Sequence, residues 1–288
     1  STCRLERGRL KTYPTEVRMT DYHPTRRDEP APLSDILAAV RARTPARILV
    51  GRAGPSYRTP TQLALRCDHA AALDAVRTEI DLGRDLGADL VASFGLFEVA
   101  TRAASKDEYL MRPDLGRRLS DGARAALAAD CPADVTLQVF VGDGLSAAAV
   151  AAQVPGLLPL LAEEARRRGW TFGRPFLVRH CRVGVLNDVG DLLRPAVAVL
   201  LIGERPGLAT AESLSAYLAY RPRAGHTDAQ RNLISNIHAR GVPVAEAAPR
   251  IAALAEKMLG QQASGVAVKE DRPALEERPP GPPALPPP

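Results

Sequence analysis

The chain has 288 residues, of which 45% are hydrophobic, enough for one large domain or two ordinary ones with a sizeable core. The formal net charge of +5 raises nucleic acid as a partner, but only 4% of the residues are aromatic and the arginines alternate with Asp and Glu. These features exclude a nucleic-acid binder and favour an acidic partner surface.

Targeting and metal-binding patterns are missing from the sequence. No apolar run approaches the roughly 18 residues that a membrane span needs, and residues 1–30 lack the apolar core of a secretory signal. We therefore expect a soluble, cytoplasmic chain that does not bind membranes. The cysteines lack CxxC or zinc-type spacing and the histidines are dispersed, so we expect free thiols and no protein-bound metal at Cys3, Cys67, Cys131 and Cys181.

Composition divides the chain into four parts. Residues 1–32 combine charges and prolines without aliphatic periodicity, which predicts a flexible N-terminal arm. Residues 33–132 show mainly helical patterns, and residues 133–270 alternate strand and helix signals. Residues 271–288 are rich in proline and cannot form a core, so we expect an extended tail.

Two strand-to-helix units are visible in the third part. Residues 135–141 predict a strand, followed by the turn Gly142-Asp143-Gly144 and a helix from Leu145. Such a turn can bind an anion, although Ala147 leaves the dinucleotide-binding fingerprint GxGxxG incomplete. A second strand at 175–178 leads through Arg182-Val183-Gly184 into a helix at 185–193.

The apolar run at residues 198–202 predicts a strand buried on both faces, ending in a Gly203–Gly207 turn before a helix near Thr210. Ligands of open α/β sheets bind just beyond the carboxyl ends of the strands. We therefore expect the turns at Gly142, Val183 and Glu204 to line one edge of a parallel sheet, where a flat cofactor could lie. Alternatively, they are only rigid crossover turns.

The fold class predicted from these patterns is α/β, with a Rossmann-like parallel sheet in the C-terminal domain and a mainly helical N-terminal region. A family resemblance runs through the same residues. Residues 203–241 contain the ordered blocks GERPGL, TAESLSAY, YRPRAGHTDAQRN and LISNIHARG, and further blocks lie at 50–59, 105–119, 141–146 and 174–193. Over roughly residues 33–270 the chain resembles the small (light) subunit of ethanolamine ammonia-lyase.

The resemblance implies a radical lyase that uses adenosylcobalamin and a hetero-oligomer with a large subunit. In that family, ethanolamine is deaminated to acetaldehyde and ammonia in the barrel of the large subunit, after cobalt–carbon homolysis generates the 5′-deoxyadenosyl radical. Residues 33–132 would dock onto the large subunit, with the loop between Arg52 and Arg58 and the charge cluster at 105–119 as contacts. Family members are associated with bacterial microcompartments, although the arm does not resemble the usual amphipathic encapsulation helix.

The family's cobalamin contacts can be carried over at three positions. They are Val183 after the strand at 175–178, Glu204 of GERPG, and Leu233, where some relatives have Cys. Because this chain has Leu instead of Cys at position 233, a cofactor contact through that side chain stays open. A contact through the backbone of Leu233 would be kept. No D-x-H-x-x-G motif is present, so cobalamin is expected with its own dimethylbenzimidazole on cobalt. We predict that Glu204→Ala weakens cobalamin retention and leaves the subunit folded.

No catalytic residue is expected in this chain, because no nucleophile elbow, P-loop or carboxylate pair is present. The chain would bind one side of the cofactor and close the site. Two alternatives remain: a non-catalytic structural adaptor that no longer contacts cofactor, and a stand-alone Rossmann-type nucleotide-binding enzyme.

Overall fold

The fold is described from a computed structural model, which describes residues 33–42, 48–206 and 210–271. The chain separates into two units, Ser1–Leu49 and Val50–Pro288. The predicted arm, Gly207 of the GERPG turn, and residues 272–288 of the predicted tail lie outside the described residues. In the first unit the structure describes one helix, α1 (Leu33–Ala42).

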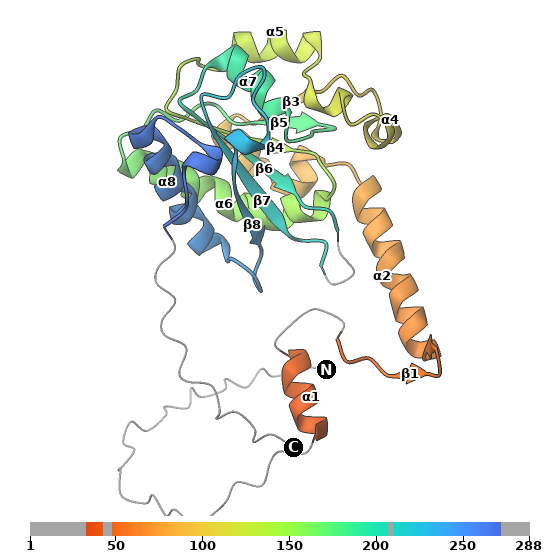
Figure 1. The fold of residues 1–288 in the computed structure, drawn as a ribbon. Helices are drawn as coiled ribbons and strands as arrows, with labels where there is room; N and C mark the ends of the chain where they lie inside the picture. Colours follow the sequence, from red (N-terminus) through yellow and green to blue (C-terminus); the bar gives the residue numbers. More distant parts are fainter. Residues whose placement is uncertain (1–32, 43–47, 207–209, 272–288) are drawn as a thin grey trace, which may run out of the picture. The chain divides into compact units, whose positions relative to one another are not determined.

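The second unit is built on a six-stranded sheet (Figure 1). The strands are β3 (Phe97–Ala100), β4 (Leu137–Gly142), β5 (Phe176–Arg179), β6 (Val197–Gly203), β7 (Leu214–Tyr220) and β8 (Asn232–Ile237). They lie in the order β3-β5-β4-β6-β7-β8. Strands β3, β5, β4 and β6 are parallel, whereas β6 pairs with β7 and β7 with β8 in antiparallel fashion.

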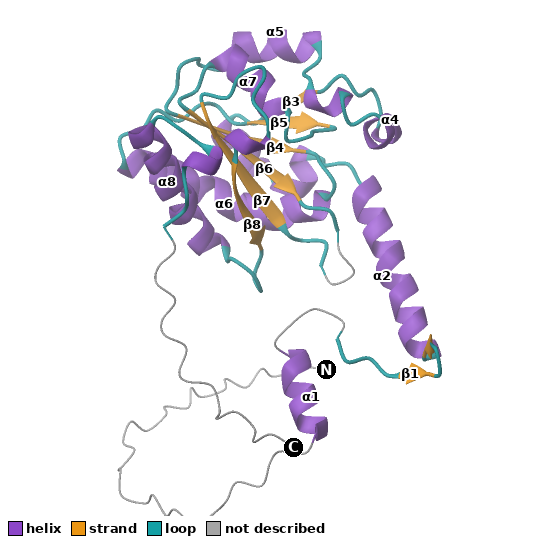
Figure 2. Cartoon of the chain, viewed as in Figure 1, coloured by secondary structure: helices purple, strands orange, loops and turns teal. Residues whose placement is uncertain are grey.

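Helices cover the two faces of the sheet unequally (Figure 2). One face packs on α6 (Ala147–Arg167) and α8 (Val244–Gln261), whose apolar sides contact β4, β6, β7 and β8. The opposite face packs on α5 (Asp121–Asp130) and α7 (Val185–Leu193). Strands β4 and β6 are buried along their whole length because helices lie on both of their faces.

The remaining elements are short or peripheral. They are the β1–β2 hairpin (Arg52–Ala53 and Ser56–Tyr57), α2 (Thr59–Arg77), η1 (Leu82–Leu86), α3 (Ala88–Phe94), α4 (Lys106–Met111), η2 (Leu115–Arg117), η3 (Asp228–Gln230) and η4 (Gly265–Ala267). Strand β3 lies in the region predicted to be mainly helical, yet it pairs with β5 in the main sheet. None of the helices described here is long and apolar enough to cross a membrane.

The helix predicted near Thr210 is wrong, because this segment forms strand β7. Its sequence LSAYLAY fits a helical period and also alternates: Leu214, Ala216 and Leu218 join the core beside α6 and α8, while Tyr217 packs against the opposite core. Seven register pairs with β6 satisfy the backbone of the strand. Tertiary pairing therefore overrides the local helical pattern.

Two further expectations need correction. The sheet is mixed rather than parallel, because β7 and β8 return antiparallel to β6. The two helices predicted at 145–152 and 157–168 are one continuous helix, α6, which runs through Pro155 and Pro159. The expected alignment of three strand ends is confirmed, since Gly142 pairs in register with Val178 of β5 and with Ile202 of β6.

Candidate functional site

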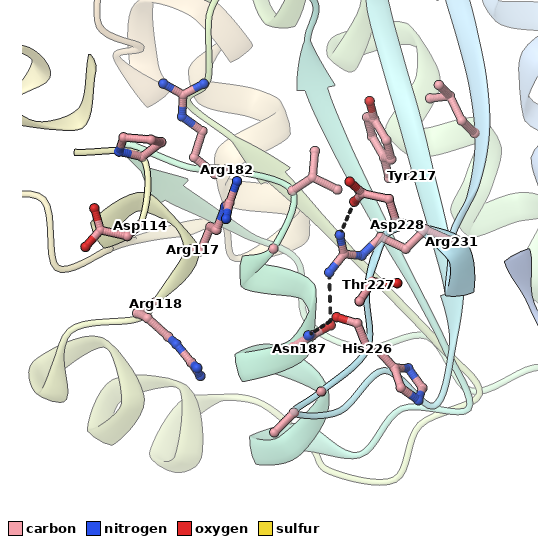
Figure 3. Close-up of a pocket in the computed structure, with 16 residues that line it drawn as sticks. Asp114, Arg117, Arg118, Arg182, Asn187, Tyr217, His226, Thr227, Asp228 and Arg231 are labelled. Atoms are coloured by element: carbon pink, nitrogen blue, oxygen red, sulfur yellow. Dashed lines mark hydrogen bonds and ion pairs between the residues drawn. The ribbon is translucent and has the colours of Figure 1, made fainter. Parts of the chain in front are cut away.

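A cavity of about 860 Å³ lies beyond the carboxyl end of β5, beside strands β7 and β8 (Figure 3). Its wall combines the 113–118 segment, the β5–α7 turn, the start of α7, the β7–β8 loop and the two antiparallel strands. The side chains that line it include charged, polar and apolar groups. Those that matter for the site are Arg117, Arg118, Arg182, Val183, Asn187, Tyr217, His226, Asp228, Arg231 and Leu233.

The apolar part of the wall comes from the sheet face that contains β7 and β8. Tyr217 pairs in register with Leu200 of β6 on one side and with Leu233 of β8 on the other. Leu200 is fully buried in the core beneath α7, Tyr217 is half-buried, and Leu233 is 46% exposed. Burial on this face therefore decreases from β6 to β8, which leaves an apolar surface facing the cavity.

The β7–β8 loop is attached to α7, on which Asn187 and Asp191 lie one turn apart. The Asn187 side-chain amide donates to the His226 carbonyl over 2.8 Å, and the Asp191 carboxylate accepts from the Ala224 N–H over 3.1 Å. A capping box between Thr227 and Gln230 fixes the following turn, η3. These bonds set the position from which the loop presents its side chains to the cavity.

Arg231 emerges from the end of this loop and is held inside the wall. Its side chain is only 7% exposed, forms an ion pair with Asp228, and donates to the Asn187 side-chain oxygen over 3.2 Å. Its Nε is buried and has no partner. The guanidinium is therefore fixed in place by groups that leave one of its donors unused.

Arg182 enters from the β5–α7 turn. Its guanidinium lies 4.2 Å from the centre of the Tyr109 ring and donates to the Tyr109 carbonyl over 3.3 Å. The Nε of Arg182 is also buried without a partner. Nearby, Gly184 allows close approach, because a Cβ there would lie 2.9 Å from Cγ of Arg117.

Two neighbouring arginines affect the pKa of His226. Desolvation, together with the charges of Arg223 and Arg231, lowers the pKa of His226 below 6.5, and the carboxylate of Asp191 opposes that shift. The His226 Nδ1 is buried without a hydrogen-bond partner. The loop therefore favours a neutral imidazole at this position.

Glu204 lies in a smaller cavity of about 190 Å³, which shares Arg182, Val183 and Tyr217 with the larger one. One carboxylate oxygen accepts from the Ser215 hydroxyl over 2.7 Å and from the Asn236 N–H over 2.8 Å. The other accepts from the Ser213 hydroxyl over 2.9 Å. Glu204 therefore connects the end of β6 to both antiparallel strands.

The contact between Glu204 and β8 depends on an irregular backbone. The β7–β8 register shifts between Leu214 and Ala216, and Asn236 has a φ of 61°. His238 supports this turn: its Nδ1 accepts from the Arg240 N–H over 3.3 Å, so its Nε2 donates to the Asn236 side-chain oxygen over 2.7 Å. His238 thereby holds the residue that donates to Glu204.

The Gly142–Gly144 turn, expected from its glycines to be able to hold an anion, is packed instead. Asp143 is fully buried and pairs with Lys106 over 2.9 Å, and the same ammonium donates to the Gly144 carbonyl. A Cβ at Gly144 would lie 2.6 Å from Cγ1 of Ile202. An internal carboxylate and cation thus occupy the place where a ligand would need space.

The three residues predicted as cofactor contacts are brought together in part. Val183 and Leu233 line the larger cavity, and Val183 and Glu204 line the smaller one. Sequence reasoning missed Tyr217, which lines both cavities with Val183 and pairs in register with Leu233, because its segment was interpreted as a helix. The strand alternation of LSAYLAY was the signal that could have found it.

Sequence reasoning also missed Arg182 and Arg231, whose roles depend on contacts between distant segments. Among the described residues, no group of three His, Cys, Asp or Glu side chains could hold a metal ion. The thiols of Cys67, Cys131 and Cys181 are free, as expected, and burial raises the pKa of Cys131 to about 11.

Comparison with known proteins places this sequence in a family. The sequence model described as Ethanolamine ammonia-lyase light chain (EutC) matches residues 34–269. The chain belongs to the ethanolamine ammonia-lyase light chain family. It is 44% identical over 229 residues to the ethanolamine ammonia-lyase small subunit of Fusobacterium nucleatum, covering 80% of this chain and 76% of that protein.

Other small subunits of ethanolamine ammonia-lyase are similarly close. The protein of Clostridium perfringens is 42% identical over 230 residues, and that of Clostridioides difficile is 41% identical over 230 residues, each covering 80% of this chain and 76% of the relative. The resemblance identified from the sequence blocks is therefore confirmed. The light-chain match includes both cavities and all of the residues that line them.

Proposed function

We propose that this light-chain member forms one wall of an adenosylcobalamin site, which the large subunit of ethanolamine ammonia-lyase completes. The observation that carries the proposal is the apolar surface of Val183, Tyr217 and Leu233, which extends from the end of β5 over the antiparallel strands β7 and β8 and adjoins the Glu204 carboxylate. A corrin ring has a broad apolar face edged with amides, and this surface offers both kinds of contact.

The residues present fit part of such a cofactor in chemistry. The larger cavity, at about 860 Å³, is the size of a site for a drug-sized ligand, so it would hold one part of adenosylcobalamin while the large subunit encloses the rest. The Glu204 carboxylate accepts three hydrogen bonds, and a carboxylate has about four lone-pair positions, so one acceptor position is left for an amide N–H.

The side chains of this chain would act by binding and orienting. When bound, adenosylcobalamin supplies the radical chemistry that deaminates ethanolamine to acetaldehyde and ammonia. Val183, Tyr217 and Leu233 would contact an apolar face of the cofactor and exclude water from it. Glu204 would fix the rotation of the ring through one amide, while its bonds to β7 and β8 keep its own position constant.

The alternative of a stand-alone nucleotide-binding enzyme gains no support from the glycine turn after β4. Asp143 and Lys106 fill that turn with a buried ion pair, and neither of the two cavities described above is lined by its glycines. A structural adaptor without cofactor contact is an outcome of the experiment below. The cytoplasm, or a bacterial microcompartment within it, is the proposed location.

The proposal is tested by co-expressing this chain with a large subunit of ethanolamine ammonia-lyase, purifying the complex through a tag on one chain, and adding adenosylcobalamin. We expect copurification and acetaldehyde formation from ethanolamine that requires both chains. A large subunit that retains corrin and forms acetaldehyde in the absence of this chain would contradict the proposal. A stable complex without corrin or turnover would identify a structural adaptor instead.

A further inference from the structure

Most of the unsatisfied polar atoms in the described part of the chain belong to residues that line the larger cavity. Four buried side-chain atoms have no hydrogen-bond partner there, and three of them are in such residues: Arg182 Nε, His226 Nδ1 and Arg231 Nε. Buried polar groups have partners in roughly 90% or more of cases in folded proteins. Arg182 and Arg231 thus line one space with guanidinium groups whose hydrogen bonds are incomplete, which indicates that a group with acceptor atoms belongs between them.

The charges around the cavity specify the sign of that group. Four arginines and two aspartates line it. Arg118 is neutralised by Asp188, which lies behind the wall, and Arg231 by Asp228. Arg182 contacts the Tyr109 ring and carbonyl, and among the described residues neither it nor Arg117 has an ion-pair partner.

The arrangement of the donors specifies the geometry of that group. Arginine has only donors, so a ligand here must supply acceptors. Figure 3 shows Arg117 and Arg182 on one side of the cavity and Arg231 on the other. The oxygens of a carboxylate lie in one plane, whereas those of a phosphate point in several directions and can reach guanidinium groups on opposite sides of the cavity. Phosphate oxygens bound by arginine also form the stronger, charge-assisted kind of hydrogen bond.

We propose that Arg182, Arg231 and Arg117 form a binding site for a phosphate ester. The inference rests on the proposed function in one respect: there, the ligand is the phosphodiester of the cofactor's nucleotide loop, which is the negatively charged group of a molecule otherwise edged with neutral amides. The Tyr217–Leu233 surface and the arginines then contact two different parts of one cofactor. A free phosphate ester has the same chemistry and is the alternative source.

The test compares two corrinoids on the copurified two-subunit complex. Cyanocobalamin carries the nucleotide loop, whereas cobinamide has the same corrin without the loop and its phosphate. Retention of each is measured by absorbance after equilibrium dialysis, for the wild type, Arg231→Gln and Arg182→Gln. The matched control is Arg223→Gln, which removes an exposed arginine of the same loop that does not line the cavity.

We expect Arg231→Gln and Arg182→Gln to weaken cyanocobalamin binding about tenfold or more, since each removes a charge-assisted contact. Cobinamide binding should change less than about twofold in the same variants, which also shows that they remain folded. Arg223→Gln should bind both corrinoids like the wild type. Equal losses for the two corrinoids, or no loss for either, would overturn the phosphate site.

A third arm separates this inference from the proposed function. If the wild-type complex binds neither corrinoid, the proposed function fails and inorganic phosphate becomes the probe. The NMR resonances of the His226 ring are then followed in the full chain during phosphate addition at constant ionic strength. A saturable shift that Arg231→Gln abolishes supports a site for a free phosphate ester, and an unchanged His226 overturns the site.

Discussion

Two turns at the same edge of the sheet, one after β4 and one after β5, follow parallel strands and contain glycine, yet they differ in charge compensation. After β4, the buried Asp143 faces Lys106, and the space around Gly144 is filled. After β5, Arg182 has an unpaired Nε beside an open cavity. The comparison teaches that a glycine turn at a strand end does not itself indicate a ligand site; the inferred site rests instead on an arginine without an ion-pair partner beside an open cavity.

The largest effect expected from this comparison concerns stability at the packed turn. Lys106→Met leaves the Asp143 carboxylate buried without its cation, and breaking a buried ion pair costs about 3–5 kcal/mol. We expect the free energy of unfolding, measured in urea, to fall by about that amount. The double variant Lys106→Met/Asp143→Leu should recover part of the loss, and a single variant as stable as the wild type would contradict this account of the turn.

A smaller effect on stability, accompanied by loss of ligand, is expected at Glu204. Glu204→Ala removes the acceptor of the Asn236 N–H and of two serine hydroxyls, which predicts a loss of about 1–3 kcal/mol in the free energy of unfolding. From the sequence alone, this variant was expected to leave the subunit folded. The structure predicts in addition that it lowers the free energy of unfolding. Corrin retention by the two-subunit complex should fall as well, and unchanged retention would remove Glu204 from the site.

The turn that positions Glu204 can be tested through Asn236, whose φ is 61°. Asn236→Ala places a less tolerant residue in the left-handed region and removes the acceptor of His238, so stability should fall by about 1–2 kcal/mol. Asn236→Gly is the matched control, because glycine adopts this backbone without strain. Equal thermal stability for the two variants would show that the backbone conformation contributes little.

The smallest expected effect is a pH dependence at the open turn. The folded chain lowers the pKa of His226 below 6.5, so in the window below 6.5 the unfolded chain binds the proton more readily. His226 should therefore destabilise the fold as the pH falls through 6.5, until the lowered pKa of the folded state is passed. An NMR titration should show the pKa of His226 rising in Arg231→Gln, where one repelling charge is gone.

Much of the fold was predictable from patterns of burial. The apolar runs that became β4 and β6 were correctly predicted as strands, β6 as a strand buried on both faces, and α7 matches the helix expected at residues 185–193. Strand β7 was missed because its alternation and a helical period fit the same seven letters. Pairing with β6 decides between them, and that pairing is not visible in local sequence.

The candidate site was predictable in outline only. Val183, Glu204 and Leu233 came from a family resemblance, and the structure brings them to two cavities that share Val183. The arginines could not have been selected from the sequence, because their significance depends on which of them lack partners. Arg231 is positioned by Asn187, 44 residues away along the chain, and Arg182 by Tyr109, 73 residues away.

The most direct test of the central claim measures the corrin retained by the purified two-subunit complex after gel filtration, using Leu233→Glu in this chain. Leu233 is already 46% exposed, so a carboxylate there should not affect folding, but it would be buried against the apolar face of the cofactor. The account predicts an intact complex that has lost its corrin, while the control Val266→Glu, at a side chain 82% exposed outside both cavities, retains it. Full corrin retention by an intact Leu233→Glu complex would contradict the placement of the cofactor on this surface.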